Sequence, residues 1–479
     1  MPDLYQKFEP KLLYGLLVFS GVYFIYLAYI SEGSYGGADG YNHFFMAQGA
    51  YSSPILLLDL WGKPLFTLLA SPFAQFGYFG IRVFNLLCGV LAALFAYKTA
   101  RLLNIKLPIL AAVLTLFGSI GLPIYLSGLT EPLFALVLSI ATFFFVRKQF
   151  LGGALVISFL FLARTEGLLI MFLFAPALWL VNKQQFIPFL ALGFFIYSII
   201  GVFAFGNFFW IINDFPYGNT AYGTGDLLHF WNYRFQIFGY PFLICILIGF
   251  ISFVLTEHSN FTLPLSHKMI SWGLIILSFA GYFAAHSYVW WKGSGSSAGL
   301  IRVILGIFPS AAILAAKAGD LVVFIPSKLR MYVALMIVLT ISYFQVQEPF
   351  HYHVVPTSWG VEEVEIQKAV NVIRANHLEE NPIVYYNSIA LFMLNKNPYV
   401  NHDGDSPLIP PHFFHHPDDL PQGTVIIYDS HFGPLEQNTE STTLLNYPEL
   451  ELLETFTTTT EHKGADGKPY KVSLFIKKL

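Results

Sequence analysis

The chain reads LLYGLLVFSGVYFIYLAYI from Leu12 to Ile30 and GGADGYNHFFMAQGAYSSPILLLDLWGKP from Gly36 to Pro64. The first run has about twenty residues, enough to cross about 30 Å of hydrocarbon as a helix. The second stretch gathers acidic, basic, hydroxyl and imidazole side chains beside that span. We therefore expect the polar stretch to emerge on the far side of a membrane. Within it, Asp39 is the residue that we expect to take part in the chemistry.

The composition of the whole chain predicts a polytopic membrane protein. Of its 479 residues, 55% are hydrophobic and only 11% are charged, where a soluble domain carries roughly 25% charged residues. A net charge of -3 does not provide the basic face that a nucleic-acid partner requires. Cys88 and Cys245 lie inside apolar runs, so they are predicted to be small hydrophobes and not disulfide or metal residues.

Apolar runs separated by Gly, Pro or charged residues predict about eleven membrane spans, and so a mainly α-helical bundle. The runs are 12–30, 83–100, 108–126, 131–146, 150–163, 167–182, 186–206, 237–256, 270–289, 302–317 and 330–346. An odd number of spans predicts that the two ends of the chain lie on opposite sides of the membrane.

Lysine and arginine set the expected orientation, because short cytoplasmic loops retain them. Basic residues recur at the N-terminus and in alternate loops, for example at Lys98, Arg147 and Lys268. The opposite face holds most of the acids that lie near spans. We therefore expect a bacterial inner-membrane protein with a cytoplasmic N-terminus and an extracytoplasmic C-terminal region.

The sequence changes character after the last run, from apolar to mixed polar residues rich in His, Pro, Asp and Glu. Val361 to His377 has helical spacing. Pro382–Tyr386, Thr424–Tyr428 and Lys471–Ile476 resemble short strands bounded by turn residues. The predicted domains are thus a membrane domain, 1–346, and a small extracytoplasmic α/β domain, 347–479.

The first candidate group is Asp39-Gly-Tyr-Asn-His43. A helix over residues 40–49 with Asp39 as its N-cap would place Asp39 and His43, four residues apart, on one face. Asp39 could then act as a general base, with His43 or Tyr41 orienting it or a substrate. Asp39 could equally be only an N-cap, because Asp is a favoured residue there.

Lys63 is the second candidate, at the start of the apolar segment that follows Trp61. Its ammonium group could bind a phosphate as a point charge. A lysine beside an interfacial Trp could instead extend its ammonium to the lipid headgroups. The sequence leaves the two interpretations open.

Two short outer loops and one later arginine complete the candidates. Glu131, between Thr130 and Pro132, suits the first turn of a helix. Arg164 and Glu166 are two residues apart at a break between spans, where they could point into a shared cavity or only pair with each other. Arg302 follows a glycine- and serine-rich loop and could bind an anion or a lipid headgroup.

Metal ligands are less evident. Asp39 and His43 could hold a divalent cation, which we regard as an optional cofactor. A second set of imidazole and carboxylate groups lies in the C-terminal region: His402, Asp403, Asp405, His412, His415, His416, Asp418, Asp419 and His431. Their spacing matches no zinc signature, so solvated loop residues are expected.

Taken together, these motifs resemble the GT-C superfamily of polytopic glycosyltransferases, which includes protein O-mannosyltransferases and lipid-A aminoarabinose transferases. The resemblance rests on the outer loop with Asp39, the Lys63-Pro64 element, SGLTEPLF (127–134), LARTEG (162–167) and YDSHFGPLE (428–436). It implies inverting hexosyl or pentosyl transfer from a polyprenyl-phosphate sugar to a hydroxyl of a glycan, lipid or protein. Asp39 matches the essential acid of the first outer loop in that superfamily.

The sequence also departs from the superfamily at two positions. Members often have His-Pro where this chain has Lys63-Pro64, and many have two adjacent acids where Gly40 follows Asp39. In the implied reaction, departure of the lipid phosphate needs cations, for which Lys63, Arg164 and Arg302 are candidates. The alternatives are a transporter or flippase of lipid-linked glycans, and a non-enzymatic membrane scaffold.

Overall fold

The computed structural model describes the chain except residues 1, 218–221, 258–262, 401–407, 410–416 and 479. The chain divides into two compact units. Unit 1 comprises Met1–Ser31 and Ile55–Pro356, and unit 2 comprises Glu32–Pro54 and Thr357–Leu479. The first part of the polar stretch, up to Pro54, is therefore grouped with the C-terminal region, which the sequence pattern does not predict.

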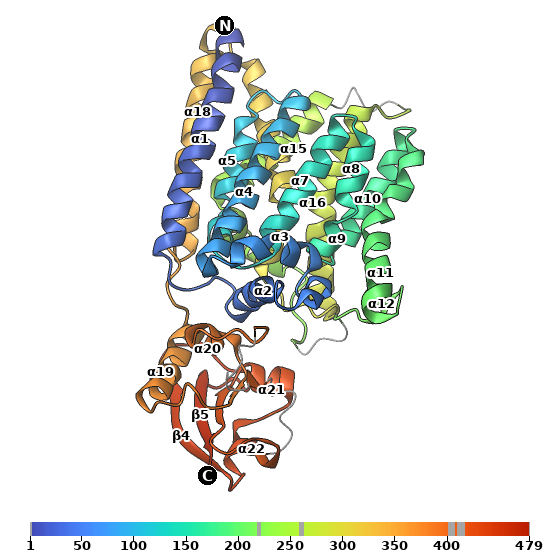
Figure 1. Ribbon diagram of the computed structural model, residues 1–479. Coiled ribbons are helices and arrows are strands. Elements are labelled where there is room, and N and C mark those ends of the chain that lie inside the picture. The colour runs from blue at the N-terminus through green and yellow to red at the C-terminus, as the bar shows by residue number, and fades with distance from the viewer. Residues whose placement is uncertain (1, 218–221, 258–262, 401–407, 410–416, 479) are drawn as a thin grey trace. The chain divides into compact units, whose positions relative to one another are not determined.

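Unit 1 is a bundle of helices, whose long members run roughly parallel (Figure 1). Its α-helices are α1 (Pro2–Ile30), α3 (Pro64–Ala74), α4 (Gly77–Leu102), α5 (Ile109–Phe117), α6 (Gly121–Tyr125), α7 (Glu131–Val146), α8 (Phe150–Ile157), α9 (Leu160–Ala163), α10 (Gly167–Leu180), α11 (Leu192–Phe205), α12 (Trp210–Asn213), α13 (His229–Asn232), α14 (Arg234–Phe238), α15 (Tyr240–Glu257), α16 (His267–Lys292), α17 (Phe308–Ala316) and α18 (Ser327–Tyr352). Its 3₁₀ segments are η2 (Gln184–Ala191), η4 (Ile301–Ile307) and η5 (Lys317–Phe324), and η1 (Pro54–Leu58) joins the two units.

Seven helical segments of the described chain are long and apolar enough to cross a membrane, and four shorter apolar helices accompany them. Each of the eleven predicted runs contains helix. Large apolar side chains of α1, α11, α15 and α18 are exposed, as expected for helices that face hydrocarbon. The predicted class, a mainly α-helical integral membrane bundle, is confirmed.

The centre of the bundle lies around α4, α5, α7 and α17. Every residue of α5 and α17 is buried, which is expected for helices that are apolar on all sides. The run 108–126, predicted as one helix, is instead broken between α5 and α6. A Cβ at Gly118 would lie 2.2 Å from the Phe308 ring, so the glycine at the break permits close packing against α17.

Unit 2 combines helices with a mixed five-stranded sheet of order β2-β1-β3-β5-β4. The parallel pairs are β2 with β1 and β1 with β3, and the antiparallel pairs are β3 with β5 and β5 with β4. Its elements are α2 (Ala38–Gly49), α19 (Val361–Ala375), β1 (Ile383–Tyr385), α20 (Ser388–Met393), β2 (Leu408–Ile409), η7 (Pro417–Asp419), β3 (Val425–Asp429), α21 (Phe432–Gln437), α22 (Ser441–Leu445), β4 (Leu450–Thr457) and β5 (Lys471–Lys477).

The predicted helix after Val361 and three predicted strands are present in unit 2 as α19, β1, β3 and β5. The sequence pattern missed β4. Its side chains are mostly exposed, and Glu451 and Glu454 interrupt its apolar residues. An edge strand of this kind lacks the buried apolar run by which a central strand such as β3 is recognised.

Candidate active site

Glu131 lies at the centre of a cluster of charged side chains in unit 1. It is the first residue of α7 and is fully buried. Thr130 occupies the N-cap position, but its hydroxyl makes no capping hydrogen bond. That hydroxyl instead accepts a hydrogen bond from Arg164 Nη1 at 3.1 Å. The polar start of α7 is therefore used to hold an arginine.

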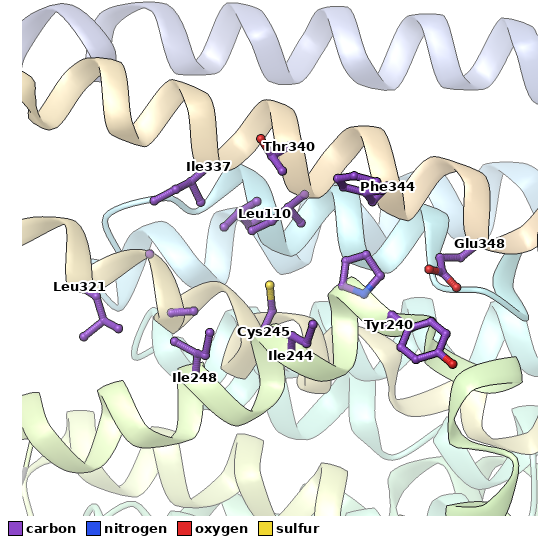
Figure 2. A pocket seen from close by; sticks show the side chains of 14 residues that line it. Leu110, Tyr240, Ile244, Cys245, Ile248, Leu321, Ile337, Thr340, Phe344 and Glu348 are labelled. Carbon is purple, nitrogen blue, oxygen red and sulfur yellow. The ribbon is translucent and has the colours of Figure 1, made fainter.

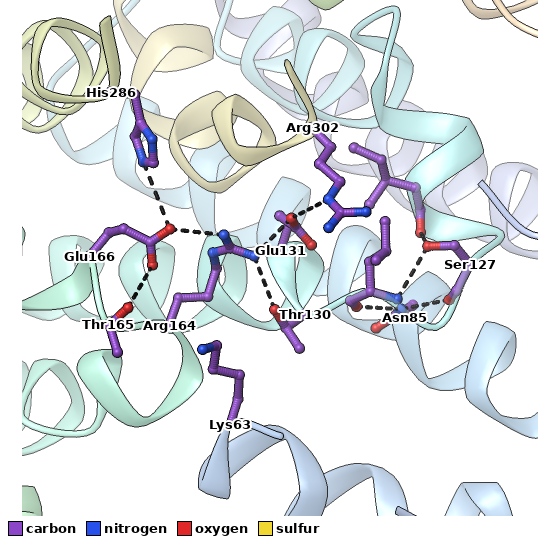
Figure 3. Close-up of polar contacts among 12 residues, drawn as sticks. Lys63, Asn85, Ser127, Thr130, Glu131, Arg164, Thr165, Glu166, His286 and Arg302 are labelled. Carbon is purple, nitrogen blue, oxygen red and sulfur yellow. Dashed lines mark hydrogen bonds and ion pairs between the residues drawn. The ribbon is translucent and has the colours of Figure 1, made fainter. Parts of the chain in front are cut away.

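Arg164 and Glu166 lie in the turn between α9 and α10, where Arg164 has extended backbone. Arg164 Nη1 is 2.7 Å from Glu131 Oε1, and Arg164 Nη2 is 2.8 Å from Glu166 Oε1. The predicted irregular turn is present, and so is the mutual ion pair. The guanidinium group bridges two carboxylates that come from different helices (Figure 3).

Arg302 and His286 extend this cluster. Arg302, the second residue of η4, places Nε 3.4 Å from Glu131 Oε1. His286 of α16 places Nε2 3.9 Å from Glu166 Oε1. Arg164, Glu166 and Arg302 expose 13%, 26% and 11% of their side chains, so the cluster is not fully closed.

Lys63 approaches the cluster from the loop before α3. Asp59 Oδ1 accepts the Gly62 backbone N–H at 2.7 Å, and Thr67 Oγ1 donates to the Gly62 carbonyl at 3.0 Å. Lys63 itself has φ +63 and ψ 93, a conformation that is rare for residues other than glycine. These contacts hold the loop in a shape that turns Lys63 into the protein.

The Lys63 side chain is only 5% exposed. Its ammonium donates to the Leu60 carbonyl at 3.3 Å and to the Tyr217 hydroxyl, and it points toward Arg164 (Figure 3). Among the described residues, no carboxylate lies within ion-pair distance of this ammonium. The interpretation of Lys63 as a lysine extended to the lipid headgroups does not fit this burial.

Electrostatic effects keep the cluster charged. Burial lowers the pKa of Lys63 to about 8, so at pH 7 this lysine is still protonated. Burial raises the pKa of Glu166, but Arg164, His286 and Lys63 outweigh it and hold that pKa well below its usual value. Burial opposes the charge of Arg164, but Glu131 and Glu166 raise the Arg164 pKa further above its usual range.

The cationic cluster, defined as Lys63, Glu131, Arg164, Glu166 and Arg302, thus has three cations and two carboxylates. Asp59, whose negative charge also acts on Lys63, is partly exposed, and one of its carboxylate oxygens accepts the Gly62 backbone N–H. Arg164 Nε and Glu131 Oε2 are buried without a hydrogen-bond partner in the described chain. A surplus of buried positive charge is costly unless an anion compensates it.

The other predicted residues, Asp39, Tyr41 and His43, belong to unit 2 and lie on α2. The prediction that Asp39 is the N-cap of this helix is wrong. Gly37, with φ +55, occupies the N-cap position, and Asp39 lies inside the first turn. A helix that begins at Ala38 after two glycines with positive φ leaves Asp39 half-buried near the positive end of the helix dipole.

Tyr41 and His43 are both buried, at 1% and 6% exposure. The Tyr41 hydroxyl donates to Glu363 Oε1 of α19 at 2.5 Å, and the Tyr41 ring centroid lies 4.2 Å from that of Phe392. Glu363 also accepts the backbone N–H groups of Ser34 and Gly360, at 3.1 and 2.6 Å. Tyr41 therefore helps to anchor α2 within unit 2.

The described residues offer no ready metal site. No group of three or more His, Cys, Asp or Glu side chains gathers there in a way that could hold an ion. Asp39 and His43 supply one carboxylate and one imidazole, and a divalent cation there stays an optional cofactor. Several residues considered for a second metal site lie outside the described residues: His402, Asp403, Asp405, His412, His415 and His416.

Sequence reasoning missed His286, which lies near the cationic cluster. Between Lys268 and Tyr288 the only ionisable residues are Tyr282 and His286, and an isolated histidine in an apolar run is a signal that could have identified it. Tyr217 belongs to the aromatic loop 207–234, which suits a membrane-interface belt or the stacking walls of a sugar site, and nothing in the sequence distinguishes it from its aromatic neighbours.

No protein-family model matches the chain, and no curated protein matches it by sequence. Solved structures do resemble it. ArnT from Cupriavidus metallidurans in the apo state has a TM-score of 0.61 at 11% identity, over 97% of this chain and 98% of ArnT. The same protein bound to undecaprenyl phosphate has a TM-score of 0.56 at 12% identity, over 96% and 97% of the two chains.

A third similar structure is the Archaeoglobus fulgidus oligosaccharyltransferase tethered to an acceptor peptide. Its TM-score is 0.53 at 12% identity, over 91% of this chain and 72% of that protein. At such identities the likeness concerns the fold and leaves the chemistry open. The chain therefore has the fold of the GT-C glycosyltransferases that its loop motifs resemble.

Proposed function

We propose that this protein is an inverting glycosyltransferase that moves a hexosyl or pentosyl group from a polyprenyl-phosphate donor to a hydroxyl group. The acceptor hydroxyl belongs to a glycan, a lipid or a protein. The fold supports this class of activity, and one of the similar structures is that of ArnT bound to undecaprenyl phosphate. The membrane domain, 1–346, is the proposed catalytic domain, and the C-terminal α/β domain, 347–479, is proposed to lie on the extracytoplasmic face.

The observation that carries the proposal is the buried ammonium of Lys63. It is held in a strained loop, donates only to neutral oxygens among its described contacts, and faces a cluster with surplus positive charge. A lipid-linked phosphate would supply the missing negative charge. Because the surroundings are largely desolvated, charge-assisted hydrogen bonds to that phosphate would be strong.

In the proposed reaction, the acceptor oxygen attacks the anomeric carbon of the sugar from the side opposite the phosphate. The bond between that carbon and the phosphate oxygen breaks, and its electron pair stays on the polyprenyl phosphate. Lys63, Arg164 and Arg302 would stabilise the charge that develops on the leaving group. Asp39 would accept the proton of the acceptor hydroxyl as general base. Glu131 and Glu166 would hold the arginines in place.

The alternative functions gain no specific support. A transporter of charged or lipid-linked substrates is expected to have ionisable groups near the middle of its spans. Here Glu131 begins α7, Arg164 and Glu166 lie between α9 and α10, and Lys63 precedes α3. A scaffold protein would have no need for a buried surplus of cations.

The test is to replace Asp39 with asparagine, which keeps the size of the side chain and removes its basicity. Purified variants are supplied with radiolabelled polyprenyl-phosphate hexose or pentose and with membranes as the acceptor source. Transfer is expected to fall about 100-fold or more, because general-base catalysis contributes about 10²–10⁴. Binding of undecaprenyl phosphate is expected to stay unchanged.

Asp214→Asn provides the matched control, since Asp214 is exposed after α12 and outside the cationic cluster. Near-normal transfer by a folded Asp39→Asn variant would show that Asp39 is not the general base. A second outcome is that the wild-type protein transfers sugar from none of the donors and instead exchanges an intact lipid-linked glycan across proteoliposome membranes. That result would show a transporter and contradict the proposed enzyme.

A further inference from the structure

A groove separate from the cationic cluster runs along the membrane bundle between α15 and α18, with further walls from α5 and η5 (Figure 2). It has a volume of about 630 Å³, and its walls are almost entirely apolar. None of its lining residues belongs to the cationic cluster or to the helices that carry the arginines. The groove is therefore a second place where a ligand could bind.

The groove has the shape of a site for one hydrocarbon chain. Along α18 its lining runs from Ile337 to Glu348, a rise of about 16 Å for eleven residues. The side chains of Leu339 and Phe344 on α18 are 59% and 54% exposed, so this helix faces outward beside the groove. In a bilayer, the opening would be in contact with lipid.

Two ionisable groups, the Tyr240 hydroxyl and the Glu348 carboxyl, lie at one end of the groove. Glu348 is only 9% exposed, and its Oε2 has no hydrogen-bond partner among the described residues. Among the described residues, no cation makes an ion pair with this carboxyl. A buried carboxyl oxygen without a partner is destabilising, so a ligand that donates to it would be stabilised there.

The surrounding backbone is built to hold Glu348 in place. Gly239 has φ +83, and a Cβ there would lie 2.6 Å from Glu348 Cγ. One turn earlier on α18, the Gln345 amide donates to the carbonyls of Phe117 and Phe238, at 2.7 and 3.0 Å. Gln345 thus satisfies backbone groups at helix breaks, whereas Glu348 lines the groove and keeps one carboxyl oxygen without a described partner.

We propose that this groove binds one acyl chain of a membrane lipid whose headgroup carries a primary ammonium, and that the ammonium donates to Glu348. The apolar walls suit the chain, and the positive headgroup supplies both the charge and the N–H donors that Glu348 lacks. The inference does not depend on the proposed glycosyl transfer, because no residue is shared between the two sites.

The test compares lipids that differ only in the headgroup. Native mass spectrometry measures binding of phosphatidylethanolamine, phosphatidylcholine and phosphatidylglycerol of identical chains to the detergent-purified full chain. Phosphatidylcholine keeps the positive charge but has no N–H donor, and phosphatidylglycerol has no positive group. Phosphatidylethanolamine is expected to bind at least about tenfold more tightly than either.

Two variants locate the site. Glu348→Gln is expected to lower phosphatidylethanolamine affinity about tenfold and to leave phosphatidylcholine binding unchanged, while Asp214→Asn changes neither. Ile341→Trp, which fills the groove, should weaken binding of the preferred lipid, and Leu339→Trp on the exposed side of α18 serves as its control. Thermal unfolding verifies that each variant is folded.

Equal binding of the three lipids by the wild-type chain, or a preference for phosphatidylglycerol, would overturn the proposal without any variant. Unchanged lipid preference in folded Glu348→Gln would overturn the assigned headgroup contact. If that variant does not fold, Ile341→Trp decides: tight phosphatidylethanolamine binding that persists with the groove filled places the lipid elsewhere.

Discussion

Two buried ionic clusters lie in unit 1, and they differ in how completely their charges are matched. In the closed cluster, Lys317 Nζ lies 2.8 Å from Glu257 Oε1 and 2.7 Å from Asp320 Oδ2. Lys268 Nζ is 2.7 Å from Glu257 Oε1, and the Lys106 backbone N–H donates to Asp320 Oδ1 at 2.8 Å. Two cations thus balance two carboxylates.

The cationic cluster has three cations and two carboxylates, and in the described part of the chain Arg164 Nε and Glu131 Oε2 have no hydrogen-bond partner. Helix α16 contributes to both clusters, with Lys268 near its start and His286 near its end. Those residues are about 27 Å apart along the helix axis. The difference teaches that a neutral, fully bonded cluster closes one end of the bundle, whereas a charged, incomplete one at the other end is suited to bind an anion.

The largest expected effect tests the closed cluster. Lys317→Met removes the shared partner of Glu257 and Asp320, so that Glu257 keeps only Lys268 and Asp320 keeps no described cation. Breaking a buried pair in this way costs about 3–5 kcal/mol of stability. Thermal or denaturant unfolding in detergent measures this loss. Undecaprenyl phosphate binding by the folded fraction should not change.

Lys268→Met is the milder control, because the Lys268 side chain is 39% exposed and exposed ion pairs contribute about 0–1 kcal/mol. If Lys317→Met left stability intact but abolished phosphate binding, the roles assigned to the two clusters would be reversed.

The next effect concerns binding. Lys63→Met removes a desolvated cation that has no carboxylate within ion-pair distance in the described chain, so stability should stay level or rise slightly. Loss of a charge-assisted contact is expected to weaken undecaprenyl phosphate binding about 10–100-fold. Lipid titration monitored by native mass spectrometry measures the effect on binding, and thermal unfolding in parallel measures the effect on stability. A large drop in stability without loss of binding would make Lys63 a structural residue like Lys317.

A smaller effect follows from the pKa of Lys63, which burial lowers to about 8. Between pH 7 and 9 the protonated fraction falls about tenfold, and phosphate affinity should fall with it. The phosphate contributes no such change, because its second pKa is near 6. Lys63→Arg keeps its charge in this range and should flatten the profile. A pH-independent wild type would show that Lys63 does not contact the phosphate.

The same titration has an opposite effect on stability. In the folded chain Lys63 loses its proton near pH 8, whereas in the unfolded chain it does so near 10.5. Between those values the unfolded state binds more protons, so stability should rise with pH. The rise is measured as the difference in unfolding free energy between wild type and Lys63→Met, which cancels the other groups that titrate there. No difference in slope would contradict the lowered pKa.

The sequence predicts those parts of the fold and the candidate site that depend on local pattern. Apolar length identifies the spans, and the loop motifs around Glu131 and Arg164 mark the ends of α7 and α9. Contacts between distant segments cannot be predicted this way. His286 reaches Glu166 from an apolar helix 120 residues further along, and Tyr217 contacts Lys63 from a loop. The grouping of Glu32–Pro54 with the C-terminal region depends on packing, not on pattern.

The smallest expected effect on activity extends the comparison to a carboxylate in unit 2 that has no cation among its described contacts. Glu363 accepts the Tyr41 hydroxyl and the backbone N–H groups of Ser34 and Gly360. Tyr41→Phe removes one of these donors and keeps the ring packed on Phe392, so it should cost about 1–3 kcal/mol. Unfolding of the full chain measures that cost. If Tyr41 only anchors α2, transfer should change less than twofold, since α2 keeps its other contacts to α20 and the following loop, from Ser388 and Asn397. A loss of transfer of about tenfold or more at unchanged stability would instead assign Tyr41 to the substrate, as its place two residues after Asp39 first suggested.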